Sequence, residues 1–103
     1  MKNLTIFIHT DDQQDLTNQL RTIEHVKGFS LFRVEGHGQE AEHDAFLSAR
    51  DNVVGSSPRI RADVVLKDGD VDTVLDAFRN MTSTGKMKGA HYWVTAVEQE
   101  GHL

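Results

Sequence analysis

The sequence has 103 residues, of which 38% are hydrophobic and 26% are charged, with one Pro and eight Gly. A chain of this size and balance is expected to fold as one domain with a modest core. A formal net charge of -5 leaves no basic stripe for general nucleic-acid binding, the absence of Cys excludes disulfides and thiol chemistry, and no apolar run approaches the ~20 residues that span a bilayer.

The N-terminal residues predict a strand followed by a helix. Segment 4–9, "LTIFIH", alternates aliphatic with other side chains, a period of two that is typical of a β-strand and unlike a signal peptide. We therefore expect a cytoplasmic protein that is not embedded in a membrane. Asp11 and Asp12 then offer a helix N-cap, and Gly28 is expected to end the helix. Apolar residues at helical spacing predict about three turns: Leu16, Leu20 and Ile23.

The rest of the chain repeats this order after a long interruption. Segment 29–35, "FSLFRVE", predicts a second strand, and segment 36–57 follows it without a clear hydrophobic period. After Pro58, segment 59–66, "RIRADVVL", alternates and predicts a third strand. A turn and cap at 68–70 precede a predicted helix with one apolar face: Val71, Val74, Leu75, Phe78 and Met81. "TSTGKMKG" breaks that helix, and "AHYWVTAV" predicts a fourth strand.

Two βαβ halves joined by a long loop describe an α+β fold of the ferredoxin-like kind, with both helices on one face of a small sheet. More apolar residues fall on the strands than two short helices can cover: Phe29, Leu31, Phe32, Val34, Tyr92, Trp93, Val94 and Val97. An open apolar face is usually buried against other subunits, so we expect a homo-oligomer. The alternative is a monomer with some exposed apolar residues.

Two stretches of the sequence resemble the PII signal-transduction family. "VEGHGQEAEH" at 34–43 resembles the start of its T-loop, where a Gly-aromatic-Gly turn opens a long loop. "SPRIRADVVLKDGDVDTVLDAFRNMTSTGKMKGAHYWV" at 57–94 resembles the second half of a PII protein, with a basic residue after Pro, the "VDTVLDAF" helix and a "TGK" turn. The resemblance covers about residues 28–97. It implies a homotrimer with ligand sites in the clefts between subunits and a T-loop, about residues 36–57, that signals to a partner.

Several features depart from the main PII pattern. "TGKMKG" replaces the usual Gly-Asp-Gly-Lys run, the loop lacks Tyr, and the sequence lacks the basic C-terminal segment that helps grip nucleotide phosphates. Glu40, and not Gln, falls where family members coordinate magnesium and 2-oxoglutarate. "GHG", "HYWV" and "GHL" look more like a divergent PII-like branch, the PII-NG type, which is linked to heavy-metal efflux systems of the RND type. The resemblance therefore implies such a transporter as the partner.

The candidate nucleotide or anion site combines glycine turns with basic side chains. Its members come from three stretches: Gly36, Gly38, Arg59, Thr84, Gly85, Lys86, Lys88 and Gly89. Glycine permits close approach of backbone amides to an anion, and Lys and Arg donate charged hydrogen bonds. The alternatives are a plain turn at 36–38, a helix C-cap with solvated lysines at 84–89, and ion pairing of the arginines, Arg61 among them, with acids such as Asp63.

Histidines provide a second kind of candidate site, because neutral imidazole binds divalent transition metals. His37, His43 and His91 are the candidate ligands, although their spacing has no diagnostic short motif. For His91, on a strand face with Trp93, the alternative is a buried, hydrogen-bonded histidine. No Ser-His-Asp order or acid pair points to catalysis, so we do not expect an enzyme.

Three functional hypotheses follow. The first is a trimeric PII-like sensor of an adenine nucleotide or metal ion. The second is a histidine-based metal buffer or donor with no nucleotide site. The third is a purely structural trimer.

Overall fold

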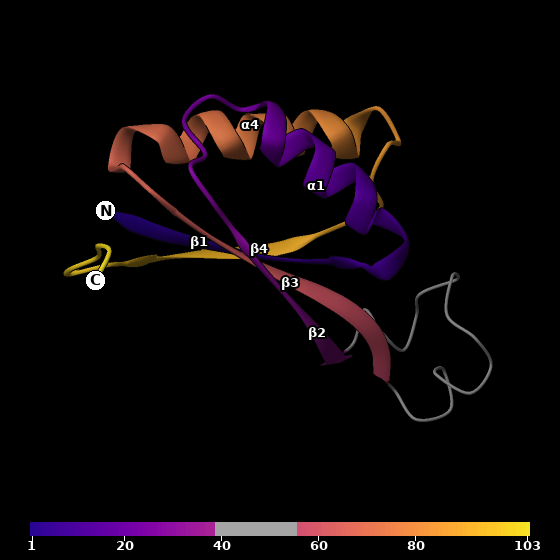
Figure 1. The fold of residues 1–103 in the computed structure, drawn as a ribbon. Helices are drawn as coiled ribbons and strands as arrows, with labels where there is room; N and C mark the ends of the chain where they lie inside the picture. The colour runs from indigo at the N-terminus through magenta and orange to yellow at the C-terminus, as the bar shows by residue number, and fades with distance from the viewer. Residues whose placement is uncertain (39–55) are drawn as a thin grey trace.

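The computed structural model describes residues 1–38 and 56–103, and the expectations for Glu40, His43 and most of the T-loop lie outside these residues. It confirms the ferredoxin-like α+β fold (Figure 1). In chain order the elements are β1 (Lys2–His9), the 3-10 turn η1 (Thr10–Asp12), α1 (Gln13–Thr22), β2 (Ser30–His37), β3 (Ser56–Leu66), the 3-10 turn η2 (Asp68–Asp70), α4 (Val71–Ser83) and β4 (His91–Ala96).

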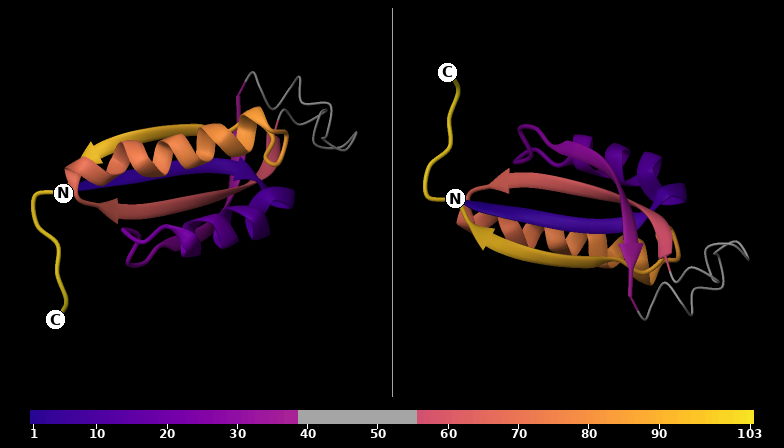
Figure 2. Two further views of the ribbon diagram at one scale, coloured as in Figure 1. Left: turned by 90° about the horizontal axis from the view of Figure 1, so that it is seen from above. Right: turned by 90° about the horizontal axis from the view of Figure 1, so that it is seen from below.

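The four strands form one antiparallel sheet in the order β2-β3-β1-β4, with β1 and β3 at its centre. Both helices lie against one face, as the views from above and below show (Figure 2). Among the described residues, no helix combines the length and apolar character needed to cross a membrane.

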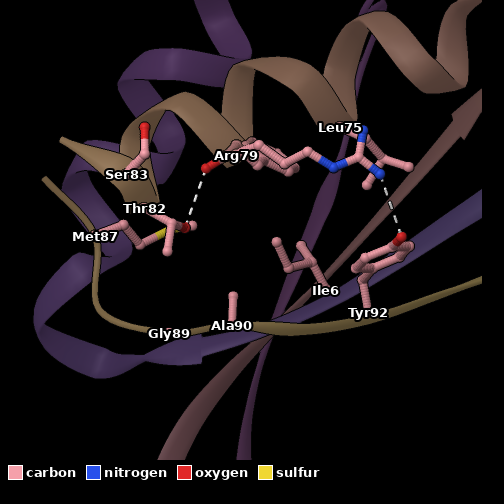
Figure 3. A pocket seen from close by; sticks show the side chains of 10 residues that line it. Ile6, Leu75, Arg79, Thr82, Ser83, Met87, Gly89, Ala90 and Tyr92 are labelled. Atoms are coloured by element: carbon pink, nitrogen blue, oxygen red, sulfur yellow. Dashed lines mark hydrogen bonds between the residues drawn. The ribbon is translucent and has the colours of Figure 1, made fainter. Parts of the chain in front are cut away.

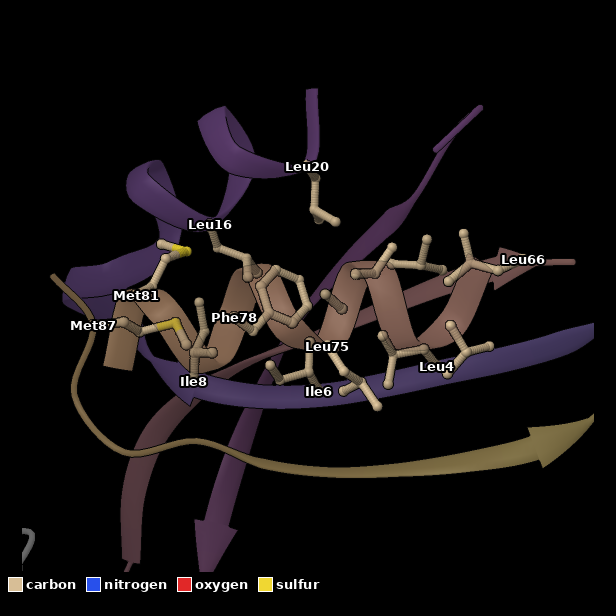
Figure 4. Packing of buried hydrophobic residues seen from close by; sticks show 14 of the residues in the cluster. Leu4, Ile6, Ile8, Leu16, Leu20, Leu66, Leu75, Phe78, Met81 and Met87 are labelled. Atoms are coloured by element: carbon tan, nitrogen blue, oxygen red, sulfur yellow. The ribbon is translucent and has the colours of Figure 1, made fainter. Parts of the chain in front are cut away.

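The period-two alternation places one side of each central strand in the core (Figure 4). Leu4 pairs with Val64 and Ile6 with Ala62 across β1 and β3, and all four side chains are buried beneath the helices. Burial of a side chain of Leu or Ile size contributes about 1.5–3 kcal/mol each. The helices supply the opposite layer, and the predicted apolar face of α4 is buried in full: Val71, Val74, Leu75, Phe78 and Met81.

The first helix ends earlier in the sequence than predicted, although its length of about three turns agrees with the prediction. It ends at Thr22, with Ile23 in an extended conformation, so neither Ile23 nor Gly28 belongs to its last turn. Asp12 precedes the helix but makes no side-chain capping bond, because its carboxylate accepts a hydrogen bond from a distant backbone amide, that of Lys88.

The second face of the sheet is called the open face here, because no helix of residues 1–38 and 56–103 lies against it. Phe32, Val65 and Trp93 lie on it with 49%, 39% and 43% of their surfaces exposed. Tyr92 and Val94 are also exposed but pair with core residues Ile6 and Leu4, so they lie on the helix side of the edge strand. The exposed apolar strand residues therefore lie in two places, on the open face of the sheet and on the helix side of the edge strand β4.

Candidate functional site

Three stretches that are distant in the sequence meet at one end of the sheet (Figures 1 and 2). Arg59 at the start of β3 pairs with His9 at the end of β1 and with Val34 near the end of β2. The turn 84–89 joins them, because Lys88 bonds to both carboxylates of η1, which directly follows β1. The predicted anion-site residues therefore gather where segment 36–57 leaves the sheet.

Gly36 lies in a strand, where the sequence predicted a turn. Gly36 and His37 pair with Ser57 and Ser56, so β2 and β3 extend further into segment 36–57 than expected. A Cβ at position 36 would lie 2.9 Å from the Cγ of Arg59 and 3.4 Å from the carbonyl oxygen of Ser57. Glycine is needed here for the close approach of the Arg59 side chain, and the chain bends only at Gly38.

Arg59 crosses Gly36 and reaches the end of β1. One of its terminal nitrogens lies 3.2 Å from Nδ1 of His9 and 3.3 Å from the carbonyl oxygen of Pro58. A guanidinium only donates, so Nδ1 of His9 accepts this bond and the imidazole proton lies on Nε2. Arg59 is half-buried beside the end of β2, from which segment 36–57 continues.

Sequence reasoning missed Ser57, which pairs with Gly36 across the two strands and has its hydroxyl oxygen 3.6 Å from where a Gly36 Cβ would lie. Its side chain is 1% exposed, and its hydroxyl oxygen has no hydrogen-bond partner in the structure. Buried hydroxyls are ordinarily bonded, so this group retains hydrogen-bonding capacity next to Gly36. The "SSP" tripeptide carries no signal of this, because the property arises from pairing with β2.

The turn 84–89 is a helix C-cap, as one of the two interpretations predicted. Gly85 has a φ of 78°, and the amides of Gly85 and Lys86 donate to the carbonyls of Thr82 and Met81. This bond pattern is the Schellman motif, which requires a left-handed residue and therefore favours glycine. Lys86, Gly89 and Thr84 are exposed around it, so the cap leaves them accessible to a ligand.

Lys88 links the turn to the end of β1. Its backbone amide donates to Asp12 Oδ2 at 3.0 Å, and its Nζ donates to Asp11 Oδ2 at 2.8 Å. The hydrogen bond and charge of Lys88 lower the pKa of the Asp11 carboxyl below its usual value. The ammonium group that was predicted to contact a phosphate thus already has an anionic partner in the same chain.

The structure separates the described histidines into different surroundings. His37 is exposed, with Nε2 3.0 Å from Oε2 of Glu35. His91 is also exposed, so the alternative of a buried, hydrogen-bonded histidine was wrong. Its ring and that of Trp93 are T-shaped relative to each other, with centroids 6.0 Å apart. Residues 1–38 and 56–103 contain no group of three or more His, Cys, Asp or Glu side chains that could hold a metal ion.

Arg61 forms an ion pair with Asp63, which was the predicted alternative to an anion-binding role. Its Nε lies 3.2 Å from Asp63 Oδ2, and its guanidinium stands about 6 Å from the ring centroids of both Phe7 and Phe32. Thr5 completes this cluster on the open face by donating to Asp63 Oδ1 at 2.6 Å.

Known proteins provide three kinds of comparison. A solved DUF3240 family protein from Shewanella baltica OS155 superposes with a TM-score of 0.77 over 99% of this chain and 94% of its own, at 20% identity, which supports the fold alone. The "Nitrogen regulatory protein P-II" of Rhizobium meliloti (strain 1021) is 27% identical over 72% of this chain, and the match spans 66% of that protein's length. The "Nitrogen regulatory protein GlnK" of Escherichia coli (strain K12) is 24% identical over 96% of this chain and 88% of its own length.

These matches support a relationship to the P-II and GlnK proteins, and their low identities show that it is a divergent one. The PII-like resemblance of the motifs agrees with this relationship. The family model described as "Protein of unknown function (DUF3240)" matches residues 1–103. The chain therefore belongs to the DUF3240 family.

Proposed function

We propose that this protein is a cytoplasmic, homotrimeric PII-like regulator, which binds a small ligand in the clefts between its subunits and signals through segment 36–57. The observation that carries the proposal is the packing of Arg59 across Gly36 at the base of that segment, 2.9 Å from where a Cβ would lie. A ligand that binds the Arg59 guanidinium and shifts its side chain would therefore act directly on β2 and β3, the strands that flank the segment. Ligand binding shifts the segment only through differential affinity for its conformers.

The trimer is supported by the open face of the sheet. Phe32, Val65 and Trp93 would be removed from water if the sheets of neighbouring subunits packed together, and each square ångström of buried apolar surface contributes roughly 25 cal/mol. Arg61 lies among the aromatic rings but is already paired with Asp63, so burial of this face would not leave the guanidinium charge without a partner.

An anion, and specifically the phosphate of an adenine nucleotide, is the ligand that the site residues fit best. Arg59 supplies a fork of donors, the Ser57 hydroxyl is unpartnered, and Lys86 is exposed on the neighbouring turn. Lys88 must exchange Asp11 for the phosphate if it takes part. A transition metal is supported less, because within the described ranges 1–38 and 56–103 His37 is paired with Glu35 and belongs to no group of three potential ligands. A complete ligand set would draw on His43 or on another subunit.

The proposed partner is a membrane transporter of the heavy-metal RND efflux type. Its support is the resemblance of "GHG", "HYWV" and "GHL" to the PII-like branch linked to such systems.

Thermal melting of metal-stripped protein tests the ligand. One series contains ATP, ADP, AMP or cyclic AMP, and the other contains zinc, copper, nickel or cobalt. A ligand at 100 times its dissociation constant adds about 2.7 kcal/mol to the free energy of unfolding, which is an easily measured shift in Tm. We expect a rise with at least one nucleotide that Arg59→Ala removes.

Arg33→Ala is the matched control, since Arg33 is an exposed arginine on the adjacent strand and pairs with Ile60, on the helix side of the sheet. A rise with metal alone that disappears in His37→Ala or His43→Ala would replace the nucleotide sensor with a histidine-based metal binder. No rise in either series would remove both ligands and leave the family and fold unchanged.

A further inference from the structure

A pocket of about 370 Å³ lies between α4 and β4, on the helix side of the sheet (Figure 3). Its floor is made by core residues that are each at most 6% exposed: Ile6, Leu75, Phe78 and Met87. The volume falls within the roughly 300–1,000 Å³ that small-molecule sites occupy. None of the predicted site residues other than Gly89 lines it, so the pocket is separate from the site around Arg59.

The pocket lies beside β4, an edge strand that α1 and α4 leave uncovered. All six residues of β4 are exposed. Gly89 and Ala90, the two small residues that precede β4, line the pocket and leave space because their side chains are absent or short. The Ala90 methyl group points into the space between α4 and β4 (Figure 3). A larger side chain at 90 would fill this space without removing any core contact.

The rim of the pocket offers hydrogen-bond donors. Arg79 donates to Asp76 Oδ1 at 2.8 Å and to the Tyr92 hydroxyl oxygen at 3.5 Å (Figure 3). Because the Tyr92 oxygen accepts from Arg79, its own hydrogen remains available for a further acceptor. The guanidinium has five N–H groups and retains donors as well, although Asp76 offsets part of its charge.

The other two polar residues of the lining are engaged with their own helix. Thr82 Oγ1 donates to the Phe78 carbonyl oxygen at 3.1 Å, and Ser83 Oγ donates to the Asn80 carbonyl oxygen at 3.1 Å. The free donors therefore concentrate at Arg79 and Tyr92, at one side of an otherwise apolar pocket. This arrangement is complementary to a molecule with an apolar body and a single anionic head.

We propose that the pocket binds a small amphipathic carboxylate, with its hydrocarbon part over Phe78 and Met87 and its carboxylate against Arg79 and Tyr92. Met87 and Gly89 belong to the turn that carries Lys88, so the occupied pocket and the end of β1 share one structural element. The proposal does not depend on the proposed nucleotide site, because Gly89 is the one residue of that site that lines the pocket, and neither Arg59 nor Lys86 does.

Octanoate and octan-1-ol, an uncharged molecule of the same chain length, are suitable probes. Each is titrated into the full-length protein below its micelle-forming or solubility limit, and amide chemical shifts are followed by NMR. We expect octanoate to shift the amides of residues 75–83 and 87–92 in a saturable manner. Arg79→Gln should weaken octanoate binding by about tenfold and leave octan-1-ol binding unchanged, because only the carboxylate uses the guanidinium.

Ala90→Phe should abolish binding of both probes by filling the pocket. Ala96→Phe is its matched control, since Ala96 is an exposed alanine on the same strand that does not line the pocket, and it should bind octanoate like the wild type. Circular dichroism confirms that each variant is folded. Undisturbed amides in these two segments would overturn the proposal, as would unchanged octanoate affinity in either Ala90→Phe or Arg79→Gln.

Discussion

The side chain of Arg59 occupies the space that a side chain at Gly36 would need, since a Cβ at 36 would lie 2.9 Å from Arg59 Cγ. This relationship joins two strands at the point where segment 36–57 begins and ends. It also sets the direction of the guanidinium, which reaches the imidazole of His9 at 3.2 Å. One glycine thus positions the cation on which the proposed ligand site depends.

Gly36→Ala should therefore displace Arg59 and reduce ligand binding while the fold remains. The φ of Gly36 is not positive, so alanine can adopt its backbone conformation, and the cost comes from crowding. Crowding costs about 1–3 kcal/mol and is offset in part by about 0.4–1 kcal/mol from the less flexible unfolded chain. We expect a net loss of about 1 kcal/mol in urea unfolding. Gly28→Ala, with open space around its Cβ, should be neutral or slightly stabilising. Equal stability of the two variants would contradict the close packing.

The proposed trimer predicts that a charge on the open face will separate the subunits. Trp93→Glu places a carboxylate beside Phe7, whose ring centroid lies 5.0 Å from that of Trp93. Light scattering after size exclusion should change from the mass of three 11.6-kDa chains to that of one. Thr73→Glu adds the same charge to the exposed surface of α4 and should stay trimeric. A wild-type protein with the mass of a single chain would exclude the trimer outright.

The buried hydroxyl of Thr5 should contribute measurably to stability. Thr5 is 0% exposed, and it donates to Asp63 at 2.6 Å. Thr5→Val keeps the shape but leaves the carboxylate short of one donor, which costs about 1–3 kcal/mol. Urea unfolding at fixed protein concentration measures the loss, because subunit association would otherwise contribute. Thr95→Val, an exposed position on the same face, should change little, and a similar effect at both positions would mean that the bond to Asp63 contributes nothing.

The sequence predicted the parts of the fold that depend on local periodicity. The alternation of β1 and β3 and the apolar face of α4 identified the core, because each pattern repeats within one element. The errors concern contacts between distant segments. Gly36 looked like a turn residue because Arg59 lies 23 positions away in the chain, and the GxG pattern contains no information about β3. Asp12 was predicted to cap the helix because an Asp before a helix commonly accepts a hydrogen bond from an amide of the first helical turn. Here its carboxylate accepts from the amide of Lys88, which is distant in the sequence.

The sequence indicated which stretches could form the proposed site, but it could not indicate the contacts that their residues make. The resemblance collected Gly36, Arg59 and the 84–89 turn, and the structure gathers these stretches at one end of the sheet. It could not show that Ser57 lacks a hydrogen-bond partner, since that depends on strand pairing. Nor could it show that His91 is exposed, because burial on an edge strand depends on how far the helices extend.

The ion pair between Asp11 and Lys88 makes stability depend on acid pH. The hydrogen bond and charge of Lys88 lower the pKa of Asp11 in the folded protein below its usual 3.8. The unfolded chain therefore binds a proton first as the pH falls, so the stabilisation is complete above about 3.8 and disappears as the pH passes through the folded pKa. The effect should be small and sensitive to salt, because Asp11 is exposed.

Asp11→Asn should thus melt at a slightly lower temperature than the wild type near pH 7, and the two curves should converge as the pH falls well below the usual Asp value. Tm is measured by circular dichroism at low and high ionic strength. Glu24→Gln removes the same charge from an exposed residue outside the helices and should track the wild type at every pH. If Asp11→Asn also tracked the wild type at low ionic strength, Lys88 would not be held by Asp11.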